Sequence, residues 1–250
     1  MNKTWVLMRG LGRESGHWGP FVETMRQALS PDQVMTVDHP GMGRQLQRAV
    51  PHSISAMAEA ARTQVPRGNG AAYILFGHSL GGMVALDWAA RYPQEVVGVV
   101  LINTSSSDTS PWDERLTLSA LHKMGKILLE SSENEREQEI LNLVSRVPDR
   151  HPTILNEWVQ IARERPVSKT VLARQLWAAS RFKLTKMMEQ KRPILCLGSM
   201  GDELVNPACS ERLARTLKAQ LALHPWAGHE VTLDDPEWVQ TQVQNWCKML

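Results

Sequence analysis

The stretch Gly77-His78-Ser79-Leu80-Gly81-Gly82 follows an apolar run at 71–76 and opens a segment of helical periodicity. A strand, a Gly-x-Ser-x-Gly turn and a helix in this order are typical of a nucleophile elbow. The turn is so tight that its central serine is strained, and a Cβ at the flanking glycines would collide with the neighbouring strand or helix. The stretch therefore predicts that Ser79 is a nucleophile at the end of a strand.

Apolar runs of strand length alternate with helical segments on both sides of this turn. Strands that are apolar on every residue are buried on both faces, as in a parallel sheet. Right-handed connections between them predict an α/β fold with a doubly wound, mostly parallel sheet of about six strands. The expected strands are 5–8, 33–37, 71–76, 96–102, 193–197 and 220–223, and the expected helices lie near 17–29, 53–65, 80–92, 207–217 and 236–248.

The alternation stops between residues 105 and 190, where only helical segments are predicted. These lie near 113–129, from Ser132 onward, near 153–163 and near 168–180. Ser132 and Glu135 have the spacing of a capping box at the start of the second segment. We therefore expect a core domain made of 1–104 and 191–250, with an all-helical cap at 105–190 inserted after the fourth strand.

Composition and charge exclude several classes of protein. The 250 residues carry 28 basic and 26 acidic side chains without a basic block, so a nucleic-acid partner is not expected. The three cysteines have no metal or redox spacing and fit a reducing compartment. No apolar run approaches the ~18–20 residues of a membrane span, and the first residues lack a signal-peptide core. We expect a cytoplasmic protein that binds no metal; the oligomeric state stays open.

A serine nucleophile needs a base, and the base needs an acid that orients it. In an elbow-containing sheet these partners follow later strands in the order Ser, Asp or Glu, His. Asp202 follows the strand at 193–197, and His229 follows the strand at 220–223. We predict that Asp202 is the acid and His229 the base. Asp108, just past the fourth strand, is the competing acid.

The transition state of acyl transfer also needs two N–H donors for its oxyanion. The Leu80 N–H lies at the positive end of a helix dipole, and Leu11 in the loop after the first strand is the second predicted donor. Gly10, Gly12, Gly16 and Asp38 also resemble a dinucleotide site. Against that site, the segment 13–18 is polar and contains an acid, and no Tyr-x-x-x-Lys pair exists. No cofactor is expected.

Together these motifs resemble the α/β-hydrolase superfamily over nearly the whole chain. The resemblance rests on the elbow, on Asp38-His39-Pro40-Gly41-Met42-Gly43, on Gly201-Asp202-Glu203-Leu204-Val205-Asn206-Pro207, on Gly228-His229 and on Trp18-Gly19-Pro20-Phe21. Small carboxylesterase-type members are the most similar. One departure is Arg9-Gly10 where the family usually has His-Gly. Arg9 either adds a cation near the site or is a surface charge, and the surface charge is the favoured interpretation.

The resemblance implies a serine hydrolase that cleaves a carboxylic ester or thioester of a small apolar acyl group. Two other classes remain open: a lyase or cofactor-free haloperoxidase that uses the same triad, and a catalytically silent binding protein. The cap is expected to supply much of an apolar pocket. The candidate substrate-binding residues are Trp18, His78, Trp112, Leu121, Met124, Trp158, Trp177 and Val205, and His17 and His39 also lie near strand-end loops.

Overall fold

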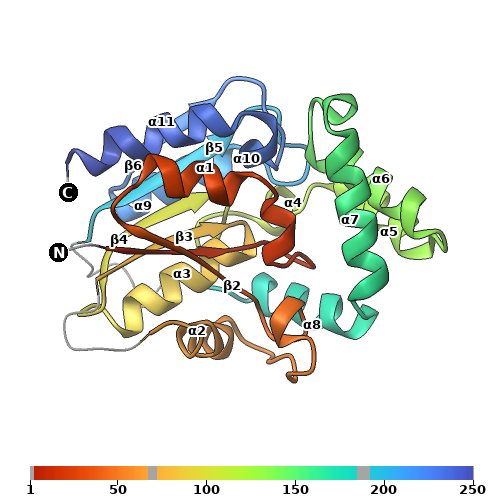
Figure 1. Cartoon of the computed structure of the whole chain (residues 1–250), viewed down its shortest axis with the longest axis horizontal. Coiled ribbons are helices and arrows are strands. Elements are labelled where there is room, and N and C mark those ends of the chain that lie inside the picture. The colour runs from red at the N-terminus through yellow and green to blue at the C-terminus, as the bar shows by residue number, and fades with distance from the viewer. Residues whose placement is uncertain (1–2, 67–71, 185–191, 250) are drawn as a thin grey trace.

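The computed structural model describes residues 3–66, 72–184 and 192–249, and six parallel strands in this part of the chain form one sheet (Figure 1). The strand order is β2-β1-β3-β4-β5-β6. The predicted doubly wound parallel sheet is confirmed. Its strands are β1 (Thr4–Met8), β2 (Gln33–Val37), β3 (Tyr73–His78), β4 (Val96–Ile102), β5 (Ile194–Ser199) and β6 (Gln220–His224). The expected start of the third strand at residue 71 lies outside the described residues.

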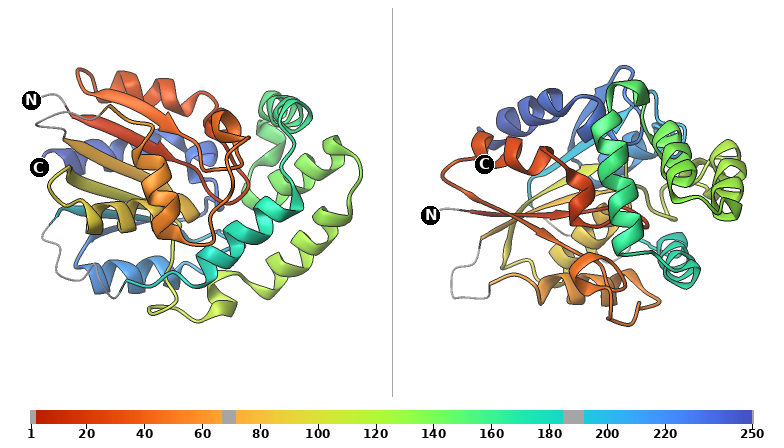
Figure 2. Two further views of the ribbon diagram at one scale, coloured as in Figure 1. Left: turned by 90° about the horizontal axis from the view of Figure 1, so that it is seen from below. Right: turned by 45° about the vertical axis from the view of Figure 1, so that its right-hand side comes forward.

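Helices cover both faces of the sheet (Figures 1 and 2). On one face lie α2 (Ile54–Arg62), α3 (Leu80–Arg91) and α9 (Ala208–Leu217), and on the other lie α1 (Phe21–Ala28) and α11 (Pro236–Cys247). The alternation along β1 explains this arrangement, since successive side chains of a strand point to opposite faces. Val6 and Met8 pack with the α2–α3 side, while Trp5 and Leu7 pack with the α1–α11 side.

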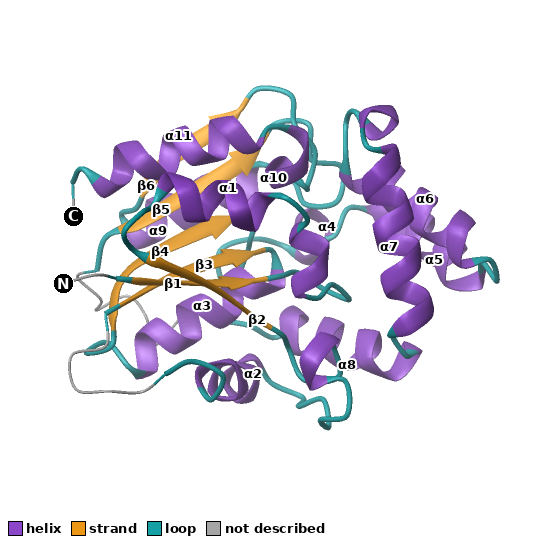
Figure 3. Cartoon of the chain, in the orientation of Figure 1, coloured by secondary structure: helices purple, strands orange, loops and turns teal. Residues whose placement is uncertain are grey.

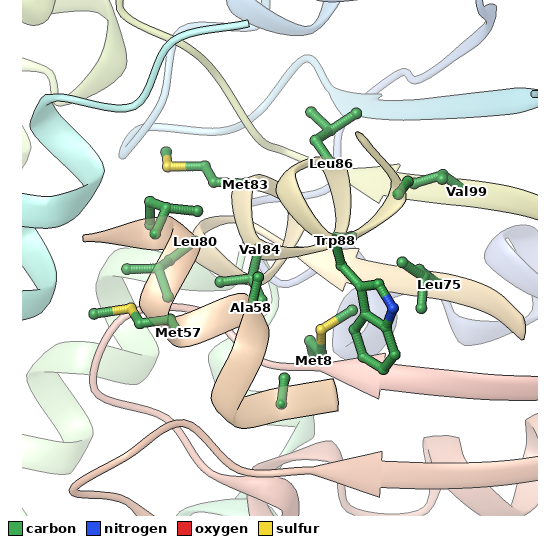
Figure 4. Packing of buried hydrophobic residues seen from close by; sticks show 14 of the residues in the cluster. Met8, Met57, Ala58, Leu75, Leu80, Met83, Val84, Leu86, Trp88 and Val99 are labelled. Atoms are coloured by element: carbon green, nitrogen blue, oxygen red, sulfur yellow. The ribbon is translucent and has the colours of Figure 1, made fainter. Parts of the chain in front are cut away.

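The core beneath α3 fixes where the elbow sits. Figure 4 shows Val84 and Trp88 of α3 beside Met8 and Leu75 of the sheet and Ala58 of α2. All five side chains are fully buried. Burial of a large apolar side chain contributes about 1.5–3 kcal/mol, so α3 is held firmly against the sheet. The first residues of α3 are thereby fixed at the carboxyl end of β3.

A helical segment connects β4 to β5 and lies beyond the carboxyl ends of the strands (Figure 3). We call its described residues, 105–184, the helical cap. The cap has its own small core, in which Leu141, Ile154 and Trp158 pack together. The expected boundary between residues 190 and 191 lies outside the described residues. The cap helices are α4 (Trp112–Arg115), α5 (Leu118–Leu129), α6 (Glu133–Val144), α7 (Pro152–Glu164) and α8 (Lys169–Ser180), with a 3-10 turn η3 (Pro148–Arg150).

Two predicted helices are each divided in the structure. The expected helix near 17–29 is a 3-10 turn, η1 (Ser15–Trp18), followed by α1, because Gly19 with φ of 50° ends the turn. The expected helix near 113–129 is α4 and α5, because the Thr117 hydroxyl accepts the Ala120 N–H and starts a new helix. Ser132 caps α6, since its hydroxyl accepts the Glu135 N–H. The other half of the predicted capping box does not form, because the Ser132 N–H donates to Glu130 Oε1 instead. Three short elements were not predicted: η2 (Gly43–Gln45), η3 and α10 (Val231–Asp234).

The described helices include none that is both long enough and apolar enough to span a membrane.

Candidate active site

Ser79 sits at the turn from β3 into α3 with a strained backbone. Its φ of 54° and ψ of −118° lie where non-glycine residues pay of order 1–3 kcal/mol. The Ser79 N–H donates to the Ile102 carbonyl at 2.8 Å, and the Thr104 hydroxyl donates to the Ser79 carbonyl at 2.7 Å. These bonds from β4 and the residues after it hold the turn in place.

The flanking glycines are required by the close approach of backbone. A Cβ on Gly77 would lie 2.4 Å from the Gly81 carbonyl oxygen. A Cβ on Gly81 would lie 2.2 Å from the Met8 carbonyl oxygen. Neither backbone segment can yield by that distance. The collision expected from the sequence is therefore present at both positions.

Asp202 and His229 come together from the loops after β5 and β6. His229 Nδ1 lies 2.7 Å from Asp202 Oδ2, and both side chains are almost fully buried. The other carboxylate oxygen, Asp202 Oδ1, accepts the N–H groups of Leu204 and Val205 at 2.8 and 2.9 Å. With Nδ1 bonded to the carboxylate, Nε2 is the His229 nitrogen available to a serine hydroxyl. Ser79 and His229 line the same cavity.

The electrostatics favour a protonatable His229. Burial alone would lower the pKa of His229. The charge and hydrogen bond of Asp202, together with the charge of Glu230, outweigh burial and raise this pKa above its ordinary value. An imidazole of this kind can take a proton and hold it as an ion pair with Asp202. The arrangement is suited to general base catalysis.

The two predicted oxyanion donors also face this cavity. Leu11 and Leu80 both line it, and neither N–H has an acceptor among the hydrogen bonds of the described residues. The loop of Leu11 is close to the elbow, since a Cβ on Gly10 would lie 3.2 Å from Ser79 Cβ. Leu80 is the first residue of α3, where N–H groups have no intrahelical acceptor. Both groups are thus free to bind an anionic oxygen.

Arg9 is buried, so the favoured interpretation of a surface charge is wrong. Arg9 is 1% exposed, and its guanidinium donates to both carboxylate oxygens of Glu230, with Nη1 at 3.0 Å from Oε2. The guanidinium also lies 4.5 Å from the centre of the Trp18 ring. Burial would raise the pKa of Glu230, but the Arg9 charge overrides it and holds this pKa well below its usual range. The pair anchors the residue that follows His229.

His78 and His39 are uncharged side chains that hydrogen-bond the backbone of the histidine loop and of Arg9. His78 Nε2 donates to the His229 carbonyl at 2.8 Å, and His39 Nε2 donates to the Arg9 carbonyl at 2.9 Å. Burial lowers the pKa of His78 to about 4 and also lowers that of His39. Both rings therefore stay uncharged at neutral pH. His78 lines the cavity as well, whereas His39 does not.

Asn103 is a residue of the site that the sequence analysis missed. It follows β4 with a positive φ of 46°, and its Nδ2 donates to Ser199 Oγ at 3.0 Å and to the His229 carbonyl at 2.9 Å. It thereby ties the ends of β4 and β5 to the histidine loop. An asparagine directly after an apolar strand is the one sequence signal that could have indicated it, because Asn tolerates the left-handed region.

The cavity has a volume of about 510 Å³ and lies between the strand ends and the cap. Such a volume suits a small organic molecule. Among the candidate substrate-binding residues, His78, Trp112, Leu121, Met124 and Val205 line it, and His17 does too. About half of the other lining residues are aliphatic, including Leu116, Ile127, Leu128, Ile140, Leu143, Val144, Leu172, Leu176 and Leu204. Charged side chains such as Arg115, Arg136 and Lys169 line the cavity as well.

Three candidate tryptophans lie outside the lining. Trp18 stacks on Phe21 at 5.7 Å between ring centres in the sheet core. Trp158 is buried in the cap core, where its ring faces Arg13. Trp177 is 51% exposed and packs against Arg181. The spacing of apolar residues along a cap helix does not show whether they face the cavity or the neighbouring cap helices.

The loop after β1 is bonded to the cap at three successive residues. The Gly12 N–H donates to Gln175 Oε1 of α8 at 2.9 Å. Arg13 Nη1 lies 2.6 Å from Glu137 Oε2 of α6, and both side chains are about nine-tenths buried or more. Glu14 pairs with Arg165 at the end of α7, with Nε 3.0 Å from the carboxylate. We call residues 10–14 the oxyanion loop.

Asp108 and Asp38, the acids of the alternative assignments, are both bonded to groups outside the triad. Asp108 Oδ2 accepts the Leu184 N–H at 2.8 Å, so it joins the first residues of the cap to the last ones described. Asp38 accepts bonds from Ser15 and Arg44, which are neighbours within the fold. Within the described ranges, no cluster of three or more His, Cys, Asp or Glu side chains has the arrangement of a metal site.

The chain is similar to known proteins over almost its whole length. It is 30% identical to a Rhizobium rhizogenes protein named "Putative carbamate hydrolase RutD", with 96% of this chain and 91% of that protein covered. It is 28% identical to the "Biotin biosynthesis bifunctional protein BioHC" of Cellvibrio japonicus, over 98% of this chain and 47% of that protein. The solved meta-cleavage product hydrolase of Pseudomonas fluorescens superposes with a TM-score of 0.80 at 15% identity, over 99% and 91% of the two chains.

A family model described as "Serine aminopeptidase, S33" matches residues 1–236. The match takes in the elbow, the acid loop and the histidine loop. The chain therefore belongs to this family of α/β-hydrolases, and the protein is a hydrolase.

Proposed function

We propose that this protein is a serine hydrolase that cleaves a carboxylic ester or thioester with a small apolar acyl group. The observation that carries the proposal is the 2.7 Å bond between Asp202 and His229 beside a cavity that Ser79 also lines. Apolar side chains are the largest group in the lining, which supports an apolar acyl group.

In the proposed mechanism, His229 Nε2 takes the proton of Ser79 Oγ as this oxygen attacks the carbonyl carbon. The N–H groups of Leu11 and Leu80 bind the oxyanion of the tetrahedral intermediate. The carbonyl re-forms, the bond to the leaving oxygen or sulfur breaks, and His229 gives its proton to the leaving group. Water then repeats the sequence on the acyl-enzyme, releasing the acid and Ser79.

A carbamate is the second candidate substrate class. It is favoured by the printed name of the 30% identical relative. The same attack on a carbamate carbonyl would give a carbamoyl-enzyme, which differs from an acyl-enzyme only in the atom beside the carbonyl. The two candidates therefore share the roles of Ser79 and His229 and differ in the fit of the cavity.

The test has two parts. A fluorophosphonate probe should label the wild-type chain and not Ser79→Ala, since only an activated serine reacts with it. Turnover of p-nitrophenyl esters of increasing chain length and of a p-nitrophenyl carbamate then separates the two classes. Ser79→Ala should lose ~10⁴–10⁶ in kcat. An unlabelled wild-type chain would indicate a silent binding protein. Labelling with turnover by Ser79 but without acyl transfer would indicate a lyase or haloperoxidase.

A further inference from the structure

Gln175 is a buried amide whose position the apolar packing of α8 does not explain. It is fully buried, and it shares the inward face of α8 with Val171 and Ala178. Its Oε1 accepts the Gly12 N–H at 2.9 Å, while its Nε2 has no partner in the described part of the chain. A buried amide costs free energy unless it is hydrogen-bonded. An aliphatic side chain could fill the same space, so the bond to Gly12 is the interaction that only a polar side chain such as Gln175 can make here.

Gly12 is the point at which the oxyanion loop meets α8. Its φ of +66° is in the left-handed region, and a Cβ there would lie 2.6 Å from Leu172 Cδ2. The loop also turns tightly, since the Arg13 N–H reaches the Gly10 carbonyl at 3.3 Å. Leu11 and Gly12 are the two central residues of this turn. A shift of Gly12 away from α8 would therefore also shift the neighbouring Leu11 N–H.

The next residues of the loop leave little freedom for compensation. Arg13 and Glu14 are both buried, and each is paired with a charged side chain of the cap. Arg13 also lies over the Trp158 ring, 4.3 Å from its centre. The loop is thus held by the cap at residues 13 and 14, and of its hydrogen bonds to the cap the one from Gly12 to Gln175 is nearest to Leu11 in the sequence.

We infer that Gln175 is a positioning residue for the proposed hydrolysis. By accepting the Gly12 N–H, it holds the oxyanion loop so that the Leu11 N–H stays free toward the cavity. The cap thereby sets the geometry of the oxyanion site as well as the walls of the pocket. The inference rests on the proposed function, because a positioned N–H matters only if an oxyanion forms.

The expected effect follows from what one donor contributes. Removal of one oxyanion donor typically costs about 10²–10³ in kcat. Gln175→Met keeps the length of the side chain and removes the acceptor, so it displaces the Leu11 N–H without deleting it. We expect kcat to fall about 10–100-fold while KM changes by less than about threefold, since the oxyanion exists only in the transition state.

The experiment compares Gln175→Met with two matched variants on p-nitrophenyl butyrate. Gln175→Glu keeps an acceptor oxygen at the same place, whether the carboxyl is ionised or neutral. Val171→Ala removes packing from the same face of α8, one turn away, and leaves the bond intact. Affinity for a trifluoromethyl ketone, which forms an oxyanion-like adduct, and a thermal melt are measured for each variant.

The expected result has three parts. Gln175→Met loses kcat and loses inhibitor affinity by a similar factor. Gln175→Glu regains most of both, and Val171→Ala lowers the melting temperature with kcat within about threefold of wild type. If Gln175→Met keeps wild-type kcat, or if Val171→Ala loses as much kcat, Gln175 is only a packing residue. A wild-type chain that the fluorophosphonate probe does not label refutes the proposed function itself, and this result is distinct from either of those.

Discussion

The buried pair of Arg9 and Glu230 permits the sharpest stability prediction. Both side chains are at most 5% exposed, so solvent does not screen their charges. The guanidinium donates hydrogen bonds to both carboxylate oxygens. Arg9→Met roughly keeps the volume and leaves the Glu230 carboxylate buried without a counter-ion. Breaking a buried pair from one side costs about 3–5 kcal/mol. For a domain of this size each kcal/mol is worth roughly 2–4 °C, so the melting temperature should fall by roughly 6–20 °C.

Urea unfolding at pH 7, followed by circular dichroism, measures this loss. The pKa of Glu230 is depressed in the folded protein, so the pair stabilises the fold at pH values above the unfolded pKa. That contribution is lost as pH falls, because a protonated Glu230 needs no counter-ion. The gap between wild type and Arg9→Met should therefore shrink toward acid pH, and the double variant Arg9→Met/Glu230→Gln should recover at least about half of the loss. A loss below about 1 kcal/mol at pH 7, or no recovery in the double variant, would refute the reasoning.

Three further predictions concern other parts of the chain. Because the pKa of His229 is raised and only its neutral form accepts a proton, kcat/KM should fall with decreasing pH around a midpoint above 6.5. A midpoint below 6.5 in the wild type would contradict this. Asp202→Asn, which removes the carboxylate beside His229, should lower kcat by about 10⁴. Gly125→Ala, with nothing within 4 Å of the new Cβ in exposed α5, should raise unfolding free energy by about 0.5–1 kcal/mol, whereas Gly81→Ala should prevent soluble expression. Burial raises the pKa of the Cys196 thiol to about 12, so iodoacetamide at pH 8 should leave it unmodified until urea unfolds the chain, as mass spectrometry of peptides can check.

Much of the fold could be predicted from the sequence because parallel strands and the helices between them have strong local patterns. The strand at 96–102 is apolar throughout and appears at the same bounds in the structure. The elbow was equally predictable, since a Cβ on Gly77 or Gly81 would collide with nearby backbone atoms and only glycine fits there. Asp202 and His229 were predicted from the order Ser, Asp or Glu, His along an elbow-containing sheet and from their places after strands that end at the same edge.

What could not be predicted depends on contacts between distant segments. Arg9 and Glu230 are 221 residues apart, and nothing in the neighbourhood of either shows that both are buried. Trp158 in α7 and Trp112 at the start of α4 are both apolar residues of cap helices, yet only Trp112 lines the cavity, because the contacts of each helix with its neighbours decide which side chains face it. From the sequence, a polar residue such as Gln175 is expected to be exposed, because the pattern of apolar residues does not show that its side chain accepts a backbone N–H.

The pairs Arg13–Glu137 and Glu14–Arg165 have a consequence for exchanging caps between related enzymes. Each pair joins a residue of the oxyanion loop to a cap residue that lies 124 or 151 positions later in the sequence. A cap taken from a relative would place different residues of α6 and α7 opposite the unchanged Arg13 and Glu14, leaving charges buried without counter-ions. A chimera that also carries residues 12–14 of the donor should fold where a cap-only chimera fails. In such an exchange, the cap and residues 12–14 therefore have to be transferred together.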